Sequence, residues 1–357
     1  MDSLDAVAFA RELIDIDSTT GREPEAGAWL AARLRREGFE VEEQPVGTTD
    51  SAESGATDFA DSTGLAGAVS APRRNLYAHF GEPPAVVLST HYDCVPPFIP
   101  SSVRDGRLYG RGSCDAKGIL AAQVAAALRL RASGERRVGL LFVVGEERGS
   151  DGAIAANGAA RGSKYLINGE PTDSRLATST RGILRVRLHA TGRAAHSAAP
   201  DHGESAIEKL VDVLLRLRAI PLPSDPDFGQ TFYTVGVIEG GVAPNVVPAH
   251  ASAEVLFRSV GPPEDILRAL TPIHPLVRVE EVLRVPHVRL HTVPGVETAA
   301  FPFTTDVPLL DRWGTPLLFG PGSFLVAHTD DECVDLTELH TAVGTYERLG
   351  RALLVGR

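Results

Sequence analysis

Short apolar runs that alternate with helical segments constrain the fold of this chain more than any other feature. Each of the first three runs is followed by polar or glycine residues. They span 39–46, 85–90 and 138–144. Residues 118–132 are typical of a helix, and residues 4–16 and 24–37 place apolar side chains three and four positions apart, as amphipathic helices do. Alternating strands and helices predict an α/β fold in which helices pack on a sheet.

After residue 181 the order of the predicted elements changes. A strand, a helix, two strands, a helix and a strand follow in turn at 183–191, 204–219, 231–239, 251–259, 263–270 and 276–283. This β-α-β-β-α-β order is the ferredoxin-like arrangement. Beyond it, the chain again offers an apolar run at 316–319 and a helix at 336–354.

The length of the chain indicates two domains, because 357 residues exceed the usual size of a single core. We therefore predict a discontinuous catalytic domain of residues 1–180 and 291–357, interrupted by a smaller inserted domain of residues 181–290. Residues 48–70, which are rich in Ser, Thr, Ala, Gly and Asp, are predicted to form an irregular insertion.

Composition and charge exclude several classes of protein. No apolar run approaches the roughly 20 residues that span a bilayer, and the N-terminal stretch lacks the features of a secretory signal. Three cysteines, Cys94, Cys114 and Cys333, favour neither a disulfide framework nor a paired-cysteine zinc site. A formal net charge of -11 disfavours nucleic acid as a partner. These features predict a cytoplasmic protein without membrane contact.

Acids and histidines gather in loops that follow the predicted strands. They are His91 and Asp93 in HYD, Asp115 in GRGSCDAKG, Glu146 and Glu147 in GEE, Glu170 in GEP and His328 in AHTDDE. Open α/β sheets bind ligands beyond the carboxyl ends of their strands, so these side chains are expected at one site. Each residue alone is more often structural, as a solvated strand end or a helix cap. Together, loops that deliver His, Asp, Glu, Glu and His predict a metal site.

The chemistry at these loops favours hydrolysis over nucleotide binding. The glycine-rich loop around Asp115 has the spacing of neither a P-loop nor a dinucleotide-binding turn. Adjacent residues usually project differently, so one of Glu146 and Glu147 can bind metal while the other meets a water. Metal-assisted hydrolysis requires this division of roles.

In order and sequence these motifs resemble those of the M20 family of metallopeptidases and deacylases, over nearly the whole chain. That family includes acetylornithine deacetylase, succinyl-diaminopimelate desuccinylase and carboxypeptidase G. The resemblance implies a zinc-exopeptidase-like α/β/α catalytic domain with an inserted ferredoxin-like domain that serves as a lid or dimerisation domain.

The resemblance also implies a site for two divalent metal ions. His91 and Glu170 resemble the ligands of one ion, Glu147 and His328 those of the other, and Asp115 the carboxylate that bridges both. This mixture of nitrogen and oxygen ligands suits zinc, and cobalt or manganese could substitute.

Two further acids have implied roles beside the ions. Asp93 resembles the acid that holds His91 in orientation, because a metal-bound histidine usually donates its other ring N–H to an acceptor. Glu146 resembles the general base, which takes a proton from water and passes it to the leaving amine.

Four residues outside the metal site are candidates for contact with substrate. His196 in GRAAHSAAP resembles a family histidine that contacts the developing oxyanion across a dimer, so a homodimer is implied. Asn245 in GGVAPNVVP and Arg258 in LFRS are candidate substrate contacts, because the planar fork of arginine suits a carboxylate. Gly322 in GPGS is a further candidate through its backbone.

The leading hypothesis is deacylation of a small N-acyl amino acid, with acetylornithine deacetylase as the most similar activity, because GEPT and the GPGS-to-AHTDDE stretch resemble that branch. A dipeptidase or carboxypeptidase acting on a short peptide stays open. So does a deacylase that releases an amino acid from a carrier protein, for which Arg181, Arg185, Arg187 and Arg193 hint at a basic docking face. A catalytically inactive interaction module is disfavoured, because every motif position keeps a competent residue.

Overall fold

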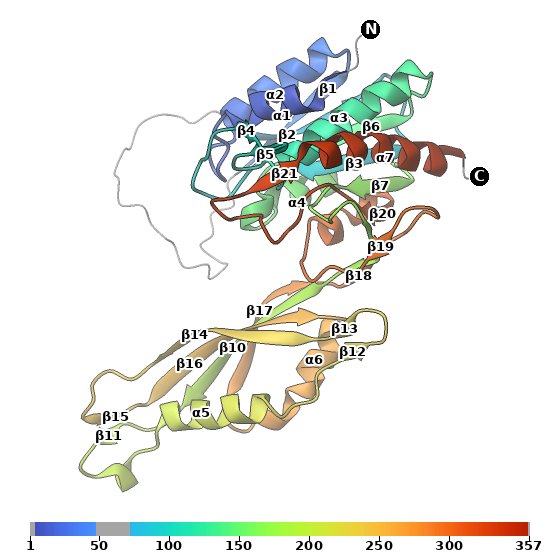
Figure 1. Ribbon diagram of the computed structural model, residues 1–357. Helices are drawn as coiled ribbons and strands as arrows, with labels where there is room; N and C mark the ends of the chain where they lie inside the picture. The colour runs from blue at the N-terminus through green and yellow to red at the C-terminus, as the bar shows by residue number, and fades with distance from the viewer. Residues whose placement is uncertain (1–3, 48–71, 356–357) are drawn as a thin grey trace.

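The computed structural model describes residues 4–47 and 72–355. The predicted insertion at 48–70 lies outside the described residues. Figure 1 shows a larger α/β part built around a six-stranded sheet and a smaller part built around a four-stranded sheet. None of the described helices is long and apolar enough to cross a membrane. The cytoplasmic location stays a prediction.

The six-stranded sheet is antiparallel at one side and parallel at the other. Its strands, in spatial order, are β1 (Glu40–Val46), β2 (Arg73–His79), β6 (Val138–Val143), β3 (Val86–His91), β7 (Tyr165–Asn168) and β20 (Thr315–Leu318). β1, β2 and β6 pair antiparallel, whereas β6, β3, β7 and β20 are parallel. The carboxyl ends of these four parallel strands therefore lie at one edge of the sheet.

Helices cover both faces of this sheet. One face packs against α1 (Ala6–Ile14), α2 (Pro24–Arg36), α3 (Lys117–Ala132) and α7 (Leu336–Val355), and the other against α4 (Asp151–Gly158). In β6, Leu140 and Phe142 face the first core and Leu141 and Val143 face the second. An apolar run without alternation is expected for a strand that is buried on both faces. The predicted α/β/α arrangement is confirmed.

The smaller part has the predicted ferredoxin-like order. Its elements are β10 (Gly182–Thr191), α5 (Ala206–Leu217), β14 (Phe232–Gly240), β16 (His250–Ser259), α6 (Pro263–Ala269) and β17 (Arg278–Val285). The strands pair antiparallel in the order β14-β16-β10-β17, over a separate apolar core. The structure therefore has an inserted domain, and its boundaries at residues 181 and 290 stay a prediction.

Short strands complete the connections. They are β4 (Ser102–Arg104), β5 (Arg107–Tyr109) and β21 (Cys333–Asp335) in one small sheet, and the pairs β8 (Leu176–Ala177) with β19 (Thr298–Ala299), β9 (Ser179–Thr180) with β18 (Val288–Arg289), β11 (Ala195–His196) with β15 (Val246–Val247) and β12 (Ser224–Asp225) with β13 (Gly229–Gln230). Pairing of β21 with β5 brings the chain after His328 against the loop that leads to Asp115.

Candidate active site

The loops after β3, β6 and β7 carry candidate residues to one edge of the sheet. His91 is the last residue of β3, Glu146 and Glu147 form a 3₁₀ turn just after β6, and Glu170 follows β7. Gly145 turns the chain into this 3₁₀ segment with φ 74°, and a Cβ there would lie 1.9 Å from Asp151 Oδ1. Only glycine fits this turn.

Asp115 lies between the two candidate histidines. Its Oδ1 is 3.1 Å from His91 Nε2, and its Oδ2 is 3.3 Å from His328 Nε2. His328 Nε2 also lies 3.0 Å from Glu147, and the ligand atoms of His91, Asp115 and Glu147 are within 4.8 Å of one another. His328 has φ 65°, a strained conformation that clusters at functional sites when it occurs outside glycine. Each carboxylate oxygen of Asp115 thus faces one histidine.

The electrostatics of this cluster are those of a site that needs added positive charge. Burial, reinforced by the charge of Glu146, raises the pKa of Glu170 well above its ordinary value, and Glu170 Oε1 is buried without a hydrogen-bond partner among the described residues. Contacts with Asp115 and Glu147 raise the pKa of His328 to about 10. Crowded carboxylates and an unpartnered buried oxygen fit the donor set of a divalent metal centre.

Asp93 holds the turn that carries Glu146 and Glu147. It is fully buried, and its Oδ1 and Oδ2 accept hydrogen bonds from the backbone N–H groups of Glu146 at 3.1 Å and Glu147 at 3.3 Å. His91 Nδ1 lies 3.0 Å from the Asp93 carbonyl oxygen and 3.5 Å from its carboxylate, which leaves Nε2 directed at Asp115. Asp93 therefore orients three predicted site residues rather than His91 alone.

Burial changes the protonation of Glu146. Its side chain is partly buried, and desolvation is the main cause that raises its pKa well above the ordinary value for glutamate. His91 opposes this shift, and bound cations would oppose it further.

The candidate residues of the inserted domain lie in two separate places. His196 on β11 and Asn245 just before β15 are exposed and adjacent, because the Ser197 N–H donates to the Asn245 carbonyl at 3.0 Å. Figure 1 shows β11 and β15 at the end of the inserted domain that is farther from the six-stranded sheet. Within one chain, the structure therefore does not bring His196 and Asn245 to the group of candidate ligands around Asp115, called the metal cluster below.

Arg258 lies at the other end of the inserted domain, near the return to the larger part. It is half-buried, and its guanidinium donates to Thr304 Oγ1 at 3.2 Å. Gly322 has φ 84°, and its N–H donates to Glu338 Oε1 at 2.9 Å. Its predicted substrate contact stays a prediction.

Sequence reasoning missed buried residues that lie next to the candidate ligands. Glu332 and Arg111 form a buried pair beside the Asp115 loop, and Asp306 is buried near Glu146. Glu332 stood within the quoted motif AHTDDE, so its proximity to His328 in sequence was a usable signal. Asp306 carried no such signal.

Other basic groups of the inserted domain are occupied within the chain. Arg185 and Arg187 both form ion pairs with Glu254, with Arg185 Nε 4.0 Å from Glu254 Oε2. Arg181 and Arg193 donate hydrogen bonds to backbone carbonyls. These contacts weaken the evidence for a basic docking face.

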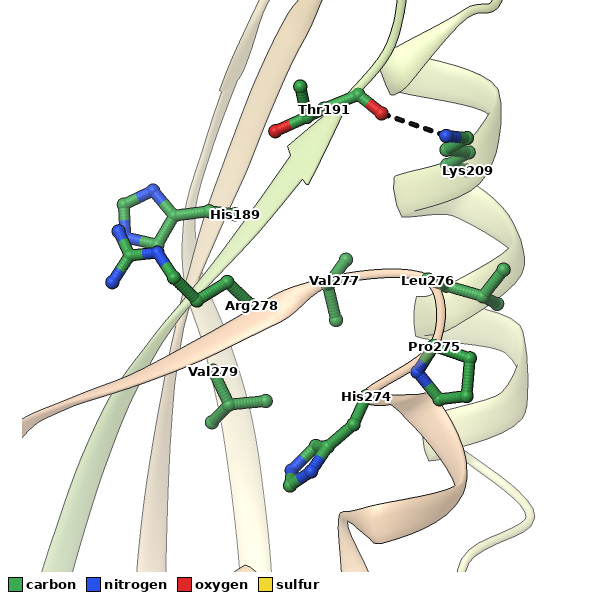
Figure 2. Close-up of a pocket in the computed structure, with 9 residues that line it drawn as sticks. All are labelled: His189, Thr191, Lys209, His274, Pro275, Leu276, Val277, Arg278 and Val279. Atoms are coloured by element: carbon green, nitrogen blue, oxygen red, sulfur yellow. Dashed lines mark hydrogen bonds between the residues drawn. The ribbon is translucent and has the colours of Figure 1, made fainter.

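A surface hollow of about 600 Å³ in the inserted domain is a separate feature (Figure 2). Glu280 Oε2 lies 2.7 Å from His189 Nε2 and accepts a hydrogen bond from Arg278 Nη2 at 3.1 Å. Lys209 Nζ donates to the Thr191 carbonyl at 2.8 Å. None of the predicted site residues lines it, so it does not compete with the metal cluster as the active site.

Comparisons with known proteins agree with this geometry. The model of peptidase family M20/M25/M40 matches residues 87–352. A protein of Aspergillus terreus named "Probable carboxypeptidase" is 37% identical over 385 residues, which cover 98% of this chain and 86% of that protein.

Two solved structures share the fold. A tripeptidase from Staphylococcus aureus matches with a TM-score of 0.74 at 22% identity, over 98% of both chains. A Bacillus subtilis protein, described as a dinuclear metal binding peptidase, matches with a TM-score of 0.68 at 14% identity, over 98% of this chain and 97% of that one. By its match to the family model and its identity to the Aspergillus terreus protein, the chain belongs to peptidase family M20/M25/M40, a family of metal-dependent hydrolases.

Proposed function

We propose that this protein is a two-metal hydrolase that cleaves the amide bond to the C-terminal amino acid of a short peptide or an N-acyl amino acid. The observation that carries this proposal is the placement of Asp115, whose two carboxylate oxygens face His91 and His328 at 3.1 and 3.3 Å. A carboxylate that offers one oxygen to each of two metal positions has this arrangement.

The cluster supplies ligands for two ions. His91 and Glu170 would hold one, Glu147 and His328 the other, and Asp115 would bridge them. Mixed nitrogen and oxygen ligands suit zinc, with cobalt or manganese as substitutes. When bound, the ions would polarise the scissile carbonyl and lower the pKa of a water between them.

Glu146 is the proposed general base. Asp93 accepts a hydrogen bond from the backbone N–H of Glu146 at 3.1 Å, and the charges of His91 and Asp115 act on the Glu146 carboxyl group. A carboxylate whose pKa is raised by desolvation can accept a proton from water and return it to the leaving amine near neutral pH.

Arg258 is the proposed carboxylate contact. Burial lowers its pKa, and no acid lies within ion-pair distance of its guanidinium among the described residues. A half-buried cation without an anionic partner favours an anionic ligand, and the guanidinium fork matches a carboxylate. The substrate is therefore proposed to carry a free α-carboxylate.

A substrate panel tests this function. Dipeptides, tripeptides, and N-acetyl and N-succinyl amino acids are each assayed for release of the C-terminal amino acid, with the matching carboxyl amides as controls. We expect release from peptides, which the carboxypeptidase name of the relative favours, and little release from the amides. Faster release from N-acetylornithine would instead select the deacetylase activity that the GEPT motif favours. Equal kcat/KM for acids and amides would refute the role of the carboxylate.

We also propose a homodimer formed through the inserted domain. Ile207, Val211 and Leu215 place an exposed apolar stripe along α5, at 39%, 50% and 56% exposed. Among the described strands, none pairs with the outer edge of β14. This edge adjoins the helix, since a Cβ at Gly240 would lie 3.1 Å from Ile207 Cγ1. An open strand edge beside an apolar helix face is a surface that a second copy can cover.

In this dimer His196 would serve the metal cluster of the partner chain and contact the developing oxyanion. Its exposure and its place far from its own cluster support this role. Mixing inactive Glu146→Ala chains with inactive His196→Ala chains tests it, because hybrid dimers regain one complete site only if His196 acts in trans. Verified hybrids that stay inactive would show that it does not.

A further inference from the structure

A buried ion pair between Arg111 and Glu332 lies beside the metal cluster and has no part in the proposed chemistry. Both side chains are almost fully buried, at 2% and 1% exposed, and Arg111 Nη1 lies 2.7 Å from Glu332 Oε2. Buried ion pairs often add little stability over apolar residues, because both charges lose their hydration. Stability alone therefore does not explain this pair. Its neighbours are three ligand loops, defined here as residues 91–99, 110–116 and 327–332.

The second oxygen of Glu332 fixes the middle ligand loop. Glu332 Oε1 accepts hydrogen bonds from the backbone N–H groups of Gly112, Cys114 and Asp115, at 2.9, 3.1 and 3.1 Å. Three donors that converge on one oxygen set the direction of the backbone that presents Asp115. The carboxylate is therefore specific for this loop conformation.

Arg111 connects the other two ligand loops. Its Nε donates to the carbonyl of Pro97 in the first loop at 3.3 Å, and its Nη1 donates to the carbonyl of Thr329 in the third loop at 3.0 Å. Arg111 itself belongs to the middle loop. One ion pair thus contacts every loop that carries His91, Asp115 or His328.

We propose that Arg111 and Glu332 are positioning residues that lock the three ligand loops into one unit, so that both metal positions form together. The inference rests on the proposed metal site. Removal of the Glu332 carboxylate would leave three buried N–H groups without their acceptor and a buried guanidinium without its negative partner, a state that favours movement of the loops. Metal affinity, rather than the fold as a whole, is then the property that this pair controls.

Zinc binding by the full-length protein tests this role. The Kd for Zn²⁺ is measured by competition with a chelating dye for wild type, Glu332→Gln and Glu332→Ala, after circular dichroism confirms that each is folded. Gln keeps an oxygen for the N–H groups but loses the charge beside Arg111, whereas Ala removes both. Loss of an outer partner of this kind typically weakens metal binding by about 10- to 100-fold, and we expect Ala to lose more than Gln.

Glu43→Gln is the matched control, because Glu43 also pairs with arginine, through Arg35 and Arg74, but on the edge strand β1. It should leave the Kd for Zn²⁺ unchanged. Glu332 variants that bind zinc as tightly as the control would overturn the inference, even if their thermal stability falls. Absence of zinc binding by wild type would instead refute the proposed function.

If neither Glu332 variant folds, the Kd for Zn²⁺ is measured for Arg111→Lys instead. Lysine keeps a cation beside Glu332 but lacks the fork that reaches the carbonyls of Pro97 and Thr329 together. A Kd that rises as in the Glu332 prediction supports the positioning role, and an unchanged Kd overturns it.

Discussion

Asp93→Asn removes one charge from the centre of the site while keeping its shape. The two carboxylate oxygens of Asp93 accept hydrogen bonds from the N–H groups of Glu146 and Glu147, and Oδ2 also accepts one from Thr20 Oγ1 at 2.9 Å. The amide of Asn replaces one oxygen by a donor. In either orientation, one backbone N–H then faces an N–H₂ group and loses its acceptor.

The magnitude follows from this loss. A hydrogen bond to a charged group contributes about 1.5–3 kcal/mol, and a buried donor left without an acceptor costs about 1–3 kcal/mol. We expect the free energy of unfolding of the metal-free protein to fall by about 2–3 kcal/mol, measured by urea denaturation at pH 7. Because the turn that carries the base loosens as well, kcat should fall by about 10- to 100-fold.

Asp5→Asn is the control for this experiment. Asp5 caps α1, and its Oδ1 accepts from the N–H groups of Val7 and Ala8 at 2.9 and 3.1 Å, but at the surface. Asn caps helices as well as Asp, so this variant should change neither stability nor kcat. Asp93→Asn that matches Asp5→Asn in both measurements would refute the positioning role of Asp93.

Three further predictions concern the proposed base, the proposed carboxylate contact and a buried acid. Glu146→Gln should keep its bound metal and lose about 10²–10⁴-fold in kcat, measured with metal content in the same preparation; unchanged turnover would reject Glu146 as the base. Arg258→Lys should raise KM more than it lowers kcat, because the charge stays and the paired geometry is lost; steady-state kinetics that match wild type would exclude a bidentate contact. Burial raises the pKa of Asp306 from 3.8 to about 7. Because the folded pKa is the higher one, protonated Asp306 contributes stability that is complete below about pH 4 and is lost as the pH rises through about 7. The free energy of unfolding changes by about 1.4 kcal/mol per unit of pKa difference. Asp306→Asn should therefore flatten the pH dependence of the unfolding free energy between about pH 4 and 7, measured by urea denaturation of chelated protein, and an unchanged slope would contradict this assignment.

The candidate ligand cluster could be predicted from the sequence because several of its residues follow strands. His91, Glu146 and Glu170 each come just after an apolar run, and parallel strands bring such positions to one edge. The ferredoxin-like order was equally accessible, since its strands alternate buried and partly exposed residues along their length, as β10 and β16 do.

Other features depended on contacts that no local pattern contains. β2 begins with polar residues and was not predicted as a strand, yet Arg73 is buried there because Glu23 and Asp151 pair with it. The role of Glu332 depends on N–H groups about 220 residues earlier in the chain. Residue type and spacing cannot reveal such partners, because the loop conformation decides where each N–H points.

Metal content and activity measured together test the central claim most directly. Protein freed of metal by chelation and dialysis is titrated with Zn²⁺, bound zinc is counted by atomic emission, and cleavage of the fastest compound in the substrate panel is followed in the same samples. The two-metal site predicts no cleavage without metal and activity that rises until two ions are bound per chain. Full activity in protein that holds no metal would contradict it.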